Sequence, residues 1–211
     1  MRLTLCASGA LLSILGVLLL NTAETKAATF NDPTWPCLQR KVENLSLGLM
    51  WSGPLDDAES SSELPPQAND LAIRLSLRRI SLEEAEPMVS AFVETRPGAD
   101  QHLMGRIFKE VFDKLNSDRK RIITGIESYS LKQIALAKKI DDTRKKMDTM
   151  MAASTPDYDE IDRLEEQLDW DERIYRDRTK SLTYVCETPV LLEKRLYGIA
   201  KILSDAAPKS N

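Results

Sequence analysis

Apolar side chains recur in alternating steps of four and three residues over the C-terminal half of the chain. Two such runs are present, and all but three positions in each run are apolar. The first run is Phe108, Phe112, Leu115, Arg119, Ile122, Ile126, Tyr129, Gln133, Leu136, Ile140, Thr143, Met147 and Met150. The second run is Ile161, Leu164, Leu168, Asp171, Tyr175, Arg178, Leu182, Val185, Pro189, Leu192, Leu196, Ile199 and Leu203. A mean spacing of about 3.5 residues is typical of a coiled-coil seam, so we predict two long helices.

The two long helices, at about 100–153 and 157–205, are predicted to form an antiparallel hairpin over residues 98–205. The link between them is too short for another arrangement. Thr155 is expected to cap the second helix, with Pro156 at its first helical position.

The register of the hairpin follows from the two seams. Seam residues face seam residues when the paired residue numbers add up to 311. This register places Gln133 opposite Arg178, as a buried polar layer that fixes the pairing. It also places Gly125 beside Cys186, where the missing side chain would leave room for another segment to dock.

The N-terminal half lacks this periodicity and divides by composition. Residues 28–54 are rich in proline and contain Trp35 and Trp51, so we predict a strip that docks on the hairpin. Residues 55–68 are acidic and rich in Ser and Pro, which is typical of a flexible loop. The last residues, 206–211, are expected to form a disordered tail.

Two short helices are predicted between the loop and the hairpin, over residues 69–97. Asn69 is a suitable N-cap for a helix over 70–79. Ser81 and Glu84 have the spacing of a capping box, which predicts the start of the second short helix. The complete fold class is therefore all-α: a long two-helix hairpin with two short helices and a pinned N-terminal segment.

The first residues of the chain, 1–27, are typical of a secretory signal peptide. Arg2 supplies a positive charge, Ala10–Leu20 supplies an apolar core, and a cut is expected after Ala27. An uncleaved membrane anchor is the alternative, because Leu3–Leu20 is mostly apolar. Cleavage would leave an exported protein, most simply periplasmic, with no stable membrane insertion.

Two cysteines, Cys37 and Cys186, remain after the expected cut. In an exported chain they most simply form one disulfide, whose closure of so long a loop would stabilise the fold by about 5 kcal/mol. Free thiols or an intermolecular bridge are the alternatives. A catalytic thiol is disfavoured, since His102 is the only histidine in the chain and no partner motif accompanies either cysteine.

Charge and motifs exclude several functions. The chain has a formal net charge of −4, and removal of the net +1 of residues 1–27 leaves −5. An acidic chain argues against nucleic acid as a partner, because phosphate binding needs a basic face. No phosphate loop, G-x-S-x-G, C-x-x-C or H-E-x-x-H motif is present, so we expect no cofactor, no metal site and no enzymatic activity.

Candidate interaction residues lie in the N-terminal strip and at the hairpin tip (residues 138–172). The tip carries an acidic second arm opposite a basic first arm, which is typical either of pairing between the arms or of a surface for a basic partner. Methionine suits adaptable contact surfaces. The candidate residues are Trp35, Trp51, Met147, Met150, Met151, Asp157, Asp159 and Glu160.

A second candidate site would bind a small anion at the hairpin base. Its basic side chains come from the predicted short helices and the start of the first long helix, and ordinary solvated surface is the competing interpretation. The residues are Arg78, Arg79, Arg96, His102 and Arg106.

The N-terminal strip also carries a local signature. Its sequence begins Trp35-Pro36-Cys37-Leu38-Gln39-Arg40-Lys41-Val42 and ends Trp51-Ser52-Gly53-Pro54. These residues resemble the N-terminal signature of a family of exported helical proteins from alphaproteobacteria. The resemblance covers about twenty residues firmly and the helical remainder loosely. The resemblance implies a location in the periplasm of a Gram-negative bacterium, and it indicates no biochemical activity.

Three functional hypotheses follow. The first is an interaction module that supports an envelope protein or complex, acting mainly as a monomer, with a dimer also open. The second is a periplasmic chaperone that holds clients between its helices, although a seam closed within one chain disfavours this. The third is a sensor of a small anionic ligand at the hairpin base.

Overall fold

The structure is a computed structural model that describes residues 32–55 and 63–208. The predicted signal segment 1–27, the centre of the predicted 55–68 loop and the end of the predicted tail lie outside the described residues. Within the described ranges the regular elements are all helices, which confirms the all-α prediction. They are α1 (Leu47–Met50), α2 (Pro66–Ser76), α3 (Leu82–Thr95), α4 (Gln101–Met151) and α5 (Tyr158–Ala206).

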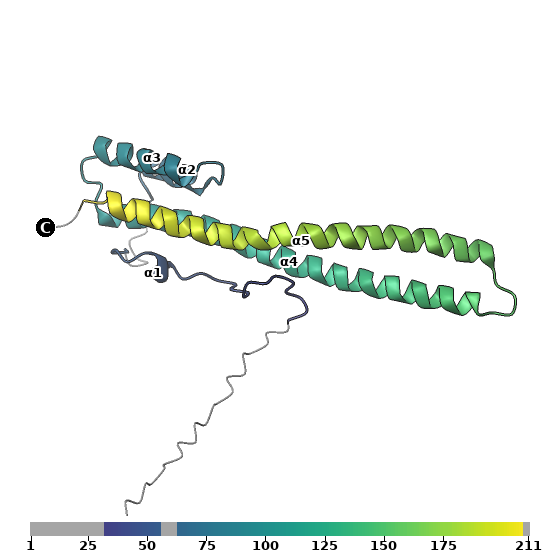
Figure 1. The fold of residues 1–211 in the computed structure, drawn as a ribbon. Helices are drawn as coiled ribbons and strands as arrows, with labels where there is room; N and C mark the ends of the chain where they lie inside the picture. The colour runs from purple at the N-terminus through teal and green to yellow at the C-terminus, as the bar shows by residue number, and fades with distance from the viewer. Residues whose placement is uncertain (1–31, 56–62, 209–211) are drawn as a thin grey trace, which may run out of the picture. The chain divides into compact units, whose positions relative to one another are not determined.

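Helices α4 and α5 form the predicted antiparallel hairpin and lie side by side along their length (Figure 1). At ~1.5 Å per residue each helix is about 75 Å long. Every position of the first predicted seam is buried or half-buried. In the second seam only Tyr175 and Val185 are exposed, at 37% and 42%. The hydrophobic spacing therefore predicted which face of each helix is buried against the other.

Contacts between the arms agree with the predicted register. That register places Ile140 opposite Asp171, and the neighbouring Lys139 pairs with Asp171 at 2.8 Å. Gln133 is buried as the expected polar layer, but its amide donates to the Tyr175 carbonyl (3.1 Å) rather than to a partner at Arg178. The Arg178 guanidinium instead lies 5.8 Å from the centre of an aromatic ring one turn away in α4.

Several helix starts follow from local capping chemistry. The capping box of α3 is confirmed: the Ser81 hydroxyl accepts from the Glu84 N–H (3.2 Å), and the Glu84 carboxylate accepts from the Ser81 N–H (2.8 Å). Asp157, and not Thr155, caps α5 by accepting from the backbone N–H three residues on (3.1 Å). The prediction of a Thr155 cap was wrong because the aspartate two residues later is a stronger acceptor for this position.

The start of α2 also differs from the prediction. The helix begins at Pro66, and Asn69 therefore lies inside its first turn rather than at its cap. Proline is favoured at the first helical position because its φ angle is already helical and its missing N–H is not needed there. The prediction of a disordered tail from residue 206 onwards is wrong at its start, since Ala206 is helical and Ala207 is buried.

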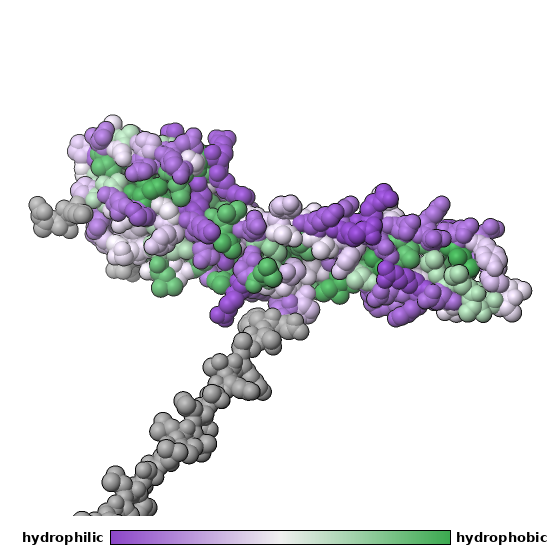
Figure 2. Space-filling model, in the orientation of Figure 1, coloured by the Kyte–Doolittle hydropathy of each residue, from purple (hydrophilic) through white to green (hydrophobic). Residues whose placement is uncertain are grey.

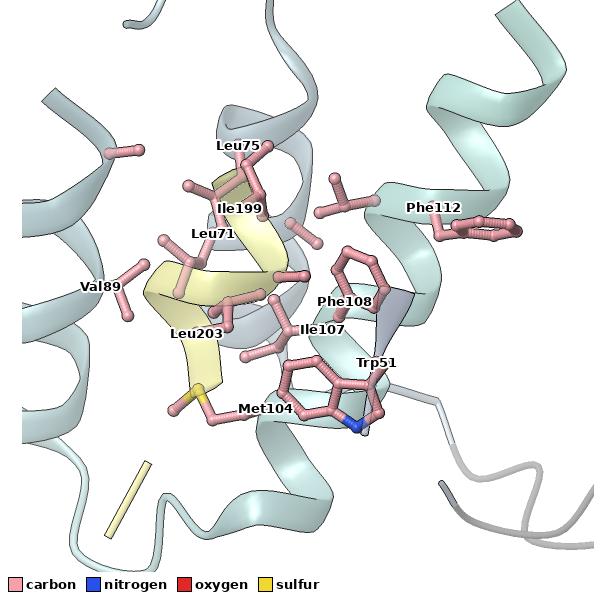
Figure 3. Close-up of a cluster of buried hydrophobic side chains, with 14 of the residues drawn as sticks. Trp51, Leu71, Leu75, Val89, Met104, Ile107, Phe108, Phe112, Ile199 and Leu203 are labelled. Carbon is pink, nitrogen blue, oxygen red and sulfur yellow. The ribbon is translucent and has the colours of Figure 1, made fainter. Parts of the chain in front are cut away.

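The main core lies at the open end of the hairpin, where four helices meet (Figure 3). Helix α2 packs against α4, and α3 packs against α5. Fully buried side chains include Leu75 from α2, Val89 from α3, Phe108 from α4 and Leu203 from α5. Because the short helices cover the hairpin only at this end, the rest of the hairpin has no other helix packed on it in the described residues.

The segment before α2, residues 32–55, runs along the hairpin, and we call it the strap. Trp51 of the strap is 4% exposed and its ring stacks on Phe108 with the ring centres 5.4 Å apart (Figure 3). The chain can approach α4 so closely because position 105 is glycine. A Cβ on Gly105 would lie 2.6 Å from the Pro54 carbonyl oxygen and 3.0 Å from the Trp51 Nε1.

Two glycine substitutions in α4 are expected to have opposite effects on stability. Gly105→Ala forces the strap away from the helix and should lower the free energy of unfolding by about 1–3 kcal/mol. Gly125→Ala is the matched control: a Cβ there has no atom within 4 Å, so removing a mid-helix glycine should stabilise by about 1 kcal/mol. Urea unfolding of both variants checks this. Equal effects of the two substitutions would contradict the described packing of the strap.

The open space around Gly125 also corrects one expectation. A Cβ at this position would have no atom within 4 Å, so the strap does not need a glycine here to dock beside Cys186.

Candidate functional site

A cavity of about 490 Å³ lies between the strap and helices α4 and α5, and it is partly open to solvent. This volume is within the range of pockets that hold small molecules. Most of its lining is apolar, with charged groups placed among the apolar walls. The apolar lining includes Trp35, Val42, Met50, Ile123, Pro189 and Tyr197.

A disulfide fixes the strap over this part of the hairpin. Cys37 and Cys186 are bonded, with their Cα atoms 5.5 Å apart, which confirms the predicted intramolecular bridge. Beside the bridge, the Gln39 side-chain amide donates to the Cys186 carbonyl. Closer to the tip, the Ser130 hydroxyl donates to the Pro33 carbonyl at 3.2 Å. The strap is therefore tied to both long helices.

Lys41 adds an ionic contact between the strap and α4. Its ammonium pairs with Glu127 of α4 and with Glu43 of the strap. The hydrogen bond to Glu127, followed by that to Glu43, raises the pKa of Lys41 above its ordinary value. Because the group lies near the surface, screening by water limits what this pair adds to stability.

Arg119 is the charged group at the floor of the cavity, and it is only 3% exposed. Its Nη1 donates to the Val42 carbonyl at 2.5 Å and lies 3.5 Å from the Glu43 carbonyl. Its Nη2 lies 3.7 Å from Glu193, which is beyond ordinary hydrogen-bond length. Its Nε has no hydrogen-bond partner among the described residues.

Burial lowers the pKa of Arg119, and the charge of Glu193 partly offsets this. A guanidinium nevertheless keeps its proton under ordinary conditions. The cavity therefore holds a buried positive charge that one half-exposed carboxylate compensates at a distance. Two further cations, Arg40 and Lys194, lie at its exposed rim.

The outer surface of the strap exposes large apolar side chains. Leu38 and Leu49 are 106% and 87% exposed, and Tyr197 on the neighbouring part of α5 is 64% exposed. Hydrophobic groups appear on the surface as small patches among mostly hydrophilic side chains (Figure 2). Isolated exposed leucines are common, but two on a covalently fixed segment beside a cavity are a candidate contact surface.

The two tryptophans of the predicted strip have different environments. Trp35 is half-buried, lines the cavity and donates from its Nε1 to the Gln39 carbonyl at 2.7 Å. Trp51 is a core residue at 4% exposure, so its side chain contributes to docking the strap on the hairpin rather than to the outer surface. A proline-rich segment has no periodicity that would reveal which tryptophan points inward.

At the hairpin tip, the predicted contact residues have mostly structural partners. Glu160 pairs with Lys146 at 2.9 Å, and Asp157 caps α5. Met147 and Met150 are half-buried in the seam, whereas Met151 is 60% exposed. Asp159 is exposed in the first turn of α5. Arg144 also pairs with Glu172 at 2.6 Å. Ion pairs between the basic and acidic arms therefore neutralise part of the charge at the tip.

The predicted anion site is divided along the chain by α3. Arg78 and Arg79 precede this helix, whereas Arg96 forms its C-cap and His102 and Arg106 lie in the first turns of α4. A 14-residue helix spans about 21 Å, so the two groups flank opposite ends of α3. The Arg96 guanidinium hydrogen-bonds to the Gln67 side chain at 3.2 Å.

Sequence reasoning missed Arg119 as a site residue. In the sequence it stands only as a polar interruption of the first seam, and its carbonyl partners come from the strap, more than seventy residues away. Its polarity at a buried seam position was the available signal, because a buried arginine needs acceptors from elsewhere. Among the described residues no group of three or more metal-ligating side chains is present.

Searches against protein-family models, curated proteins and solved structures found no match to this chain. Within the part of the chain that the structure describes, no helix has the length and apolar character needed to span a membrane.

Proposed function

We propose that this protein is a non-enzymatic accessory module of the bacterial envelope, exported to the periplasm, which binds one protein partner through the outer surface of the strap. The observation that carries the proposal is the exposure of Leu38 and Leu49 on a segment fixed by a disulfide. A fixed apolar surface loses little conformational freedom when a partner covers it, and this favours binding. The disulfide is compatible with an oxidising compartment such as the periplasm.

The charges beside this surface indicate the kind of partner. Arg40 and Lys194 are exposed, and both line the cavity beside the strap together with Tyr197. A complementary protein surface would present an apolar patch bordered by carboxylates. The long hairpin, whose seam is closed within the chain, would then act as a rigid support for the strap.

Site-specific photo-crosslinking in intact cells tests this proposal. A photoreactive amino acid replaces Leu38 in one strain, and Trp170 in a matched control strain. Trp170 is also exposed and apolar, at 60%, and lies on α5 about 40 Å from Tyr197 along the helix. We expect one crosslinked envelope protein from position 38 and none from position 170.

Other outcomes would refute the proposal. A broad set of unfolded exported clients would favour a chaperone. Products from position 170 alone would move the interface to the tip, and a crosslinked second copy of this chain would replace the partner with self-association.

A further inference from the structure

The cavity beneath the strap combines three features that are not needed merely to hold the strap on the hairpin. Its walls are apolar, its floor holds the buried Arg119 guanidinium, and its volume of about 490 Å³ leaves room for a molecule. Arg119 holds the strap mainly through its Nη1, which donates to the Val42 carbonyl. The Nε has no partner among the described residues, and the Nη2 has only a distant one at Glu193.

The Nε and Nη2 of an arginine form the edge that binds a carboxylate with two parallel hydrogen bonds. An unsatisfied buried donor is costly, and a bound carboxylate would satisfy this edge. The charges that line the cavity have a positive balance, since Arg40, Arg119 and Lys194 outnumber Glu193. This balance differs in sign from the formal net charge of −4 of the whole chain.

We propose that this cavity binds a small amphipathic carboxylate, such as a fatty acid anion. The carboxylate pairs with the Nε–Nη2 edge of Arg119, and the alkyl chain lies against Trp35, Met50 and Pro189. Glu193 acts against this binding, because its carboxylate competes for the same guanidinium. The inference goes beyond the proposed function and does not depend on it.

Calorimetry with three ligands of equal chain length tests the chemistry directly. The protein is used with its disulfide intact, and dodecanoate, methyl dodecanoate and dodecylammonium are titrated below the concentrations at which they aggregate. We expect dodecanoate to bind with one-to-one stoichiometry and about tenfold or more tighter than the other two, since hydrogen bonds to charged groups are the strong ones. Equal binding of the ester, or no binding of any ligand, would overturn the proposal.

A pair of substitutions on α5 then locates the site. Glu193→Gln removes the competing carboxylate and should tighten dodecanoate binding by about threefold to tenfold, while a role limited to structure predicts no gain. Glu187→Gln is the control, because Glu187 is exposed on the same helix and does not line the cavity. An unchanged affinity in Glu193→Gln would contradict the assignment.

Arg119→Lys is expected to weaken dodecanoate binding, in contrast to Glu193→Gln. Lysine keeps the charge but has no planar edge for two parallel bonds, so dodecanoate affinity should fall by about tenfold. Lys194→Met, at the exposed rim, should also weaken dodecanoate binding, and it leaves the hydrogen bond from Arg119 to the strap unchanged. If binding survives both substitutions unchanged, the ligand lies elsewhere and the proposed site is wrong.

Discussion

Replacement of Trp51 by alanine is expected to lower the free energy of unfolding by about 3–5 kcal/mol, the range for a large aromatic side chain in a core. Trp51 is buried, stacks on Phe108, and donates from its Nε1 to the Pro54 carbonyl at 3.3 Å. Its removal would leave a cavity between the strap and α4. Urea unfolding followed by circular dichroism measures the change.

Two other tryptophan substitutions sharpen this test. Trp170→Ala removes an exposed ring and should change stability by about 0.5 kcal/mol or less. Trp51→Phe keeps an aromatic ring against Phe108 but loses the N–H donor, so its effect should lie between those of the two alanine variants. A loss below about 1 kcal/mol in Trp51→Ala would show that the strap does not belong to the core.

Loss of the Cys37–Cys186 disulfide is expected to have an effect of similar size. The bridge joins residues 149 positions apart, and the chain-entropy model assigns about 5 kcal/mol to the closure of so long a loop. The double variant Cys37→Ser/Cys186→Ser should therefore unfold at a much lower urea concentration. On a non-reducing gel the unmodified protein should migrate faster than this variant.

Reduction supplies the control for that prediction. Unmodified protein treated with a reductant should unfold with the same midpoint as the double variant, whereas the variant itself should not respond to the reductant. Equal midpoints for the oxidised and reduced protein would contradict a stabilising role of the bridge. The remaining anchors, such as the Arg119 contact to Val42, predict that the strap stays partly docked in the variant.

Much of the fold could be predicted because the main signals are periodic or local. The two seams predicted the hairpin, its buried faces and its register. The Ser81–Glu84 capping box predicted the start of α3 from four consecutive residues. The disulfide was predicted because Cys37 and Cys186 are the two cysteines that lie outside the predicted signal segment.

The rest depends on contacts between distant segments. Trp51 is buried because Gly105, more than fifty residues later, lets the strap approach α4. Arg119 became a site residue only when the strap supplied its carbonyl partners. The predicted group of basic residues at the hairpin base was divided because the two ends of α3 are a helix length apart. Neither the composition nor the periodicity of the sequence indicates which of these distant segments lie close together in the fold.

The affinity of the purified protein for the partner captured from position 38 tests the central claim most directly. The double variant Leu38→Asp/Leu49→Asp places two charges on the strap surface, and Trp170→Asp is the control on the hairpin arm. Both changes are at exposed positions, so the melting temperatures should stay close to that of the unmodified protein. We expect the strap variant to bind about tenfold or more weakly and the control to bind as before. Unchanged binding in the strap variant, or a loss confined to Trp170→Asp, would contradict an interface on the strap.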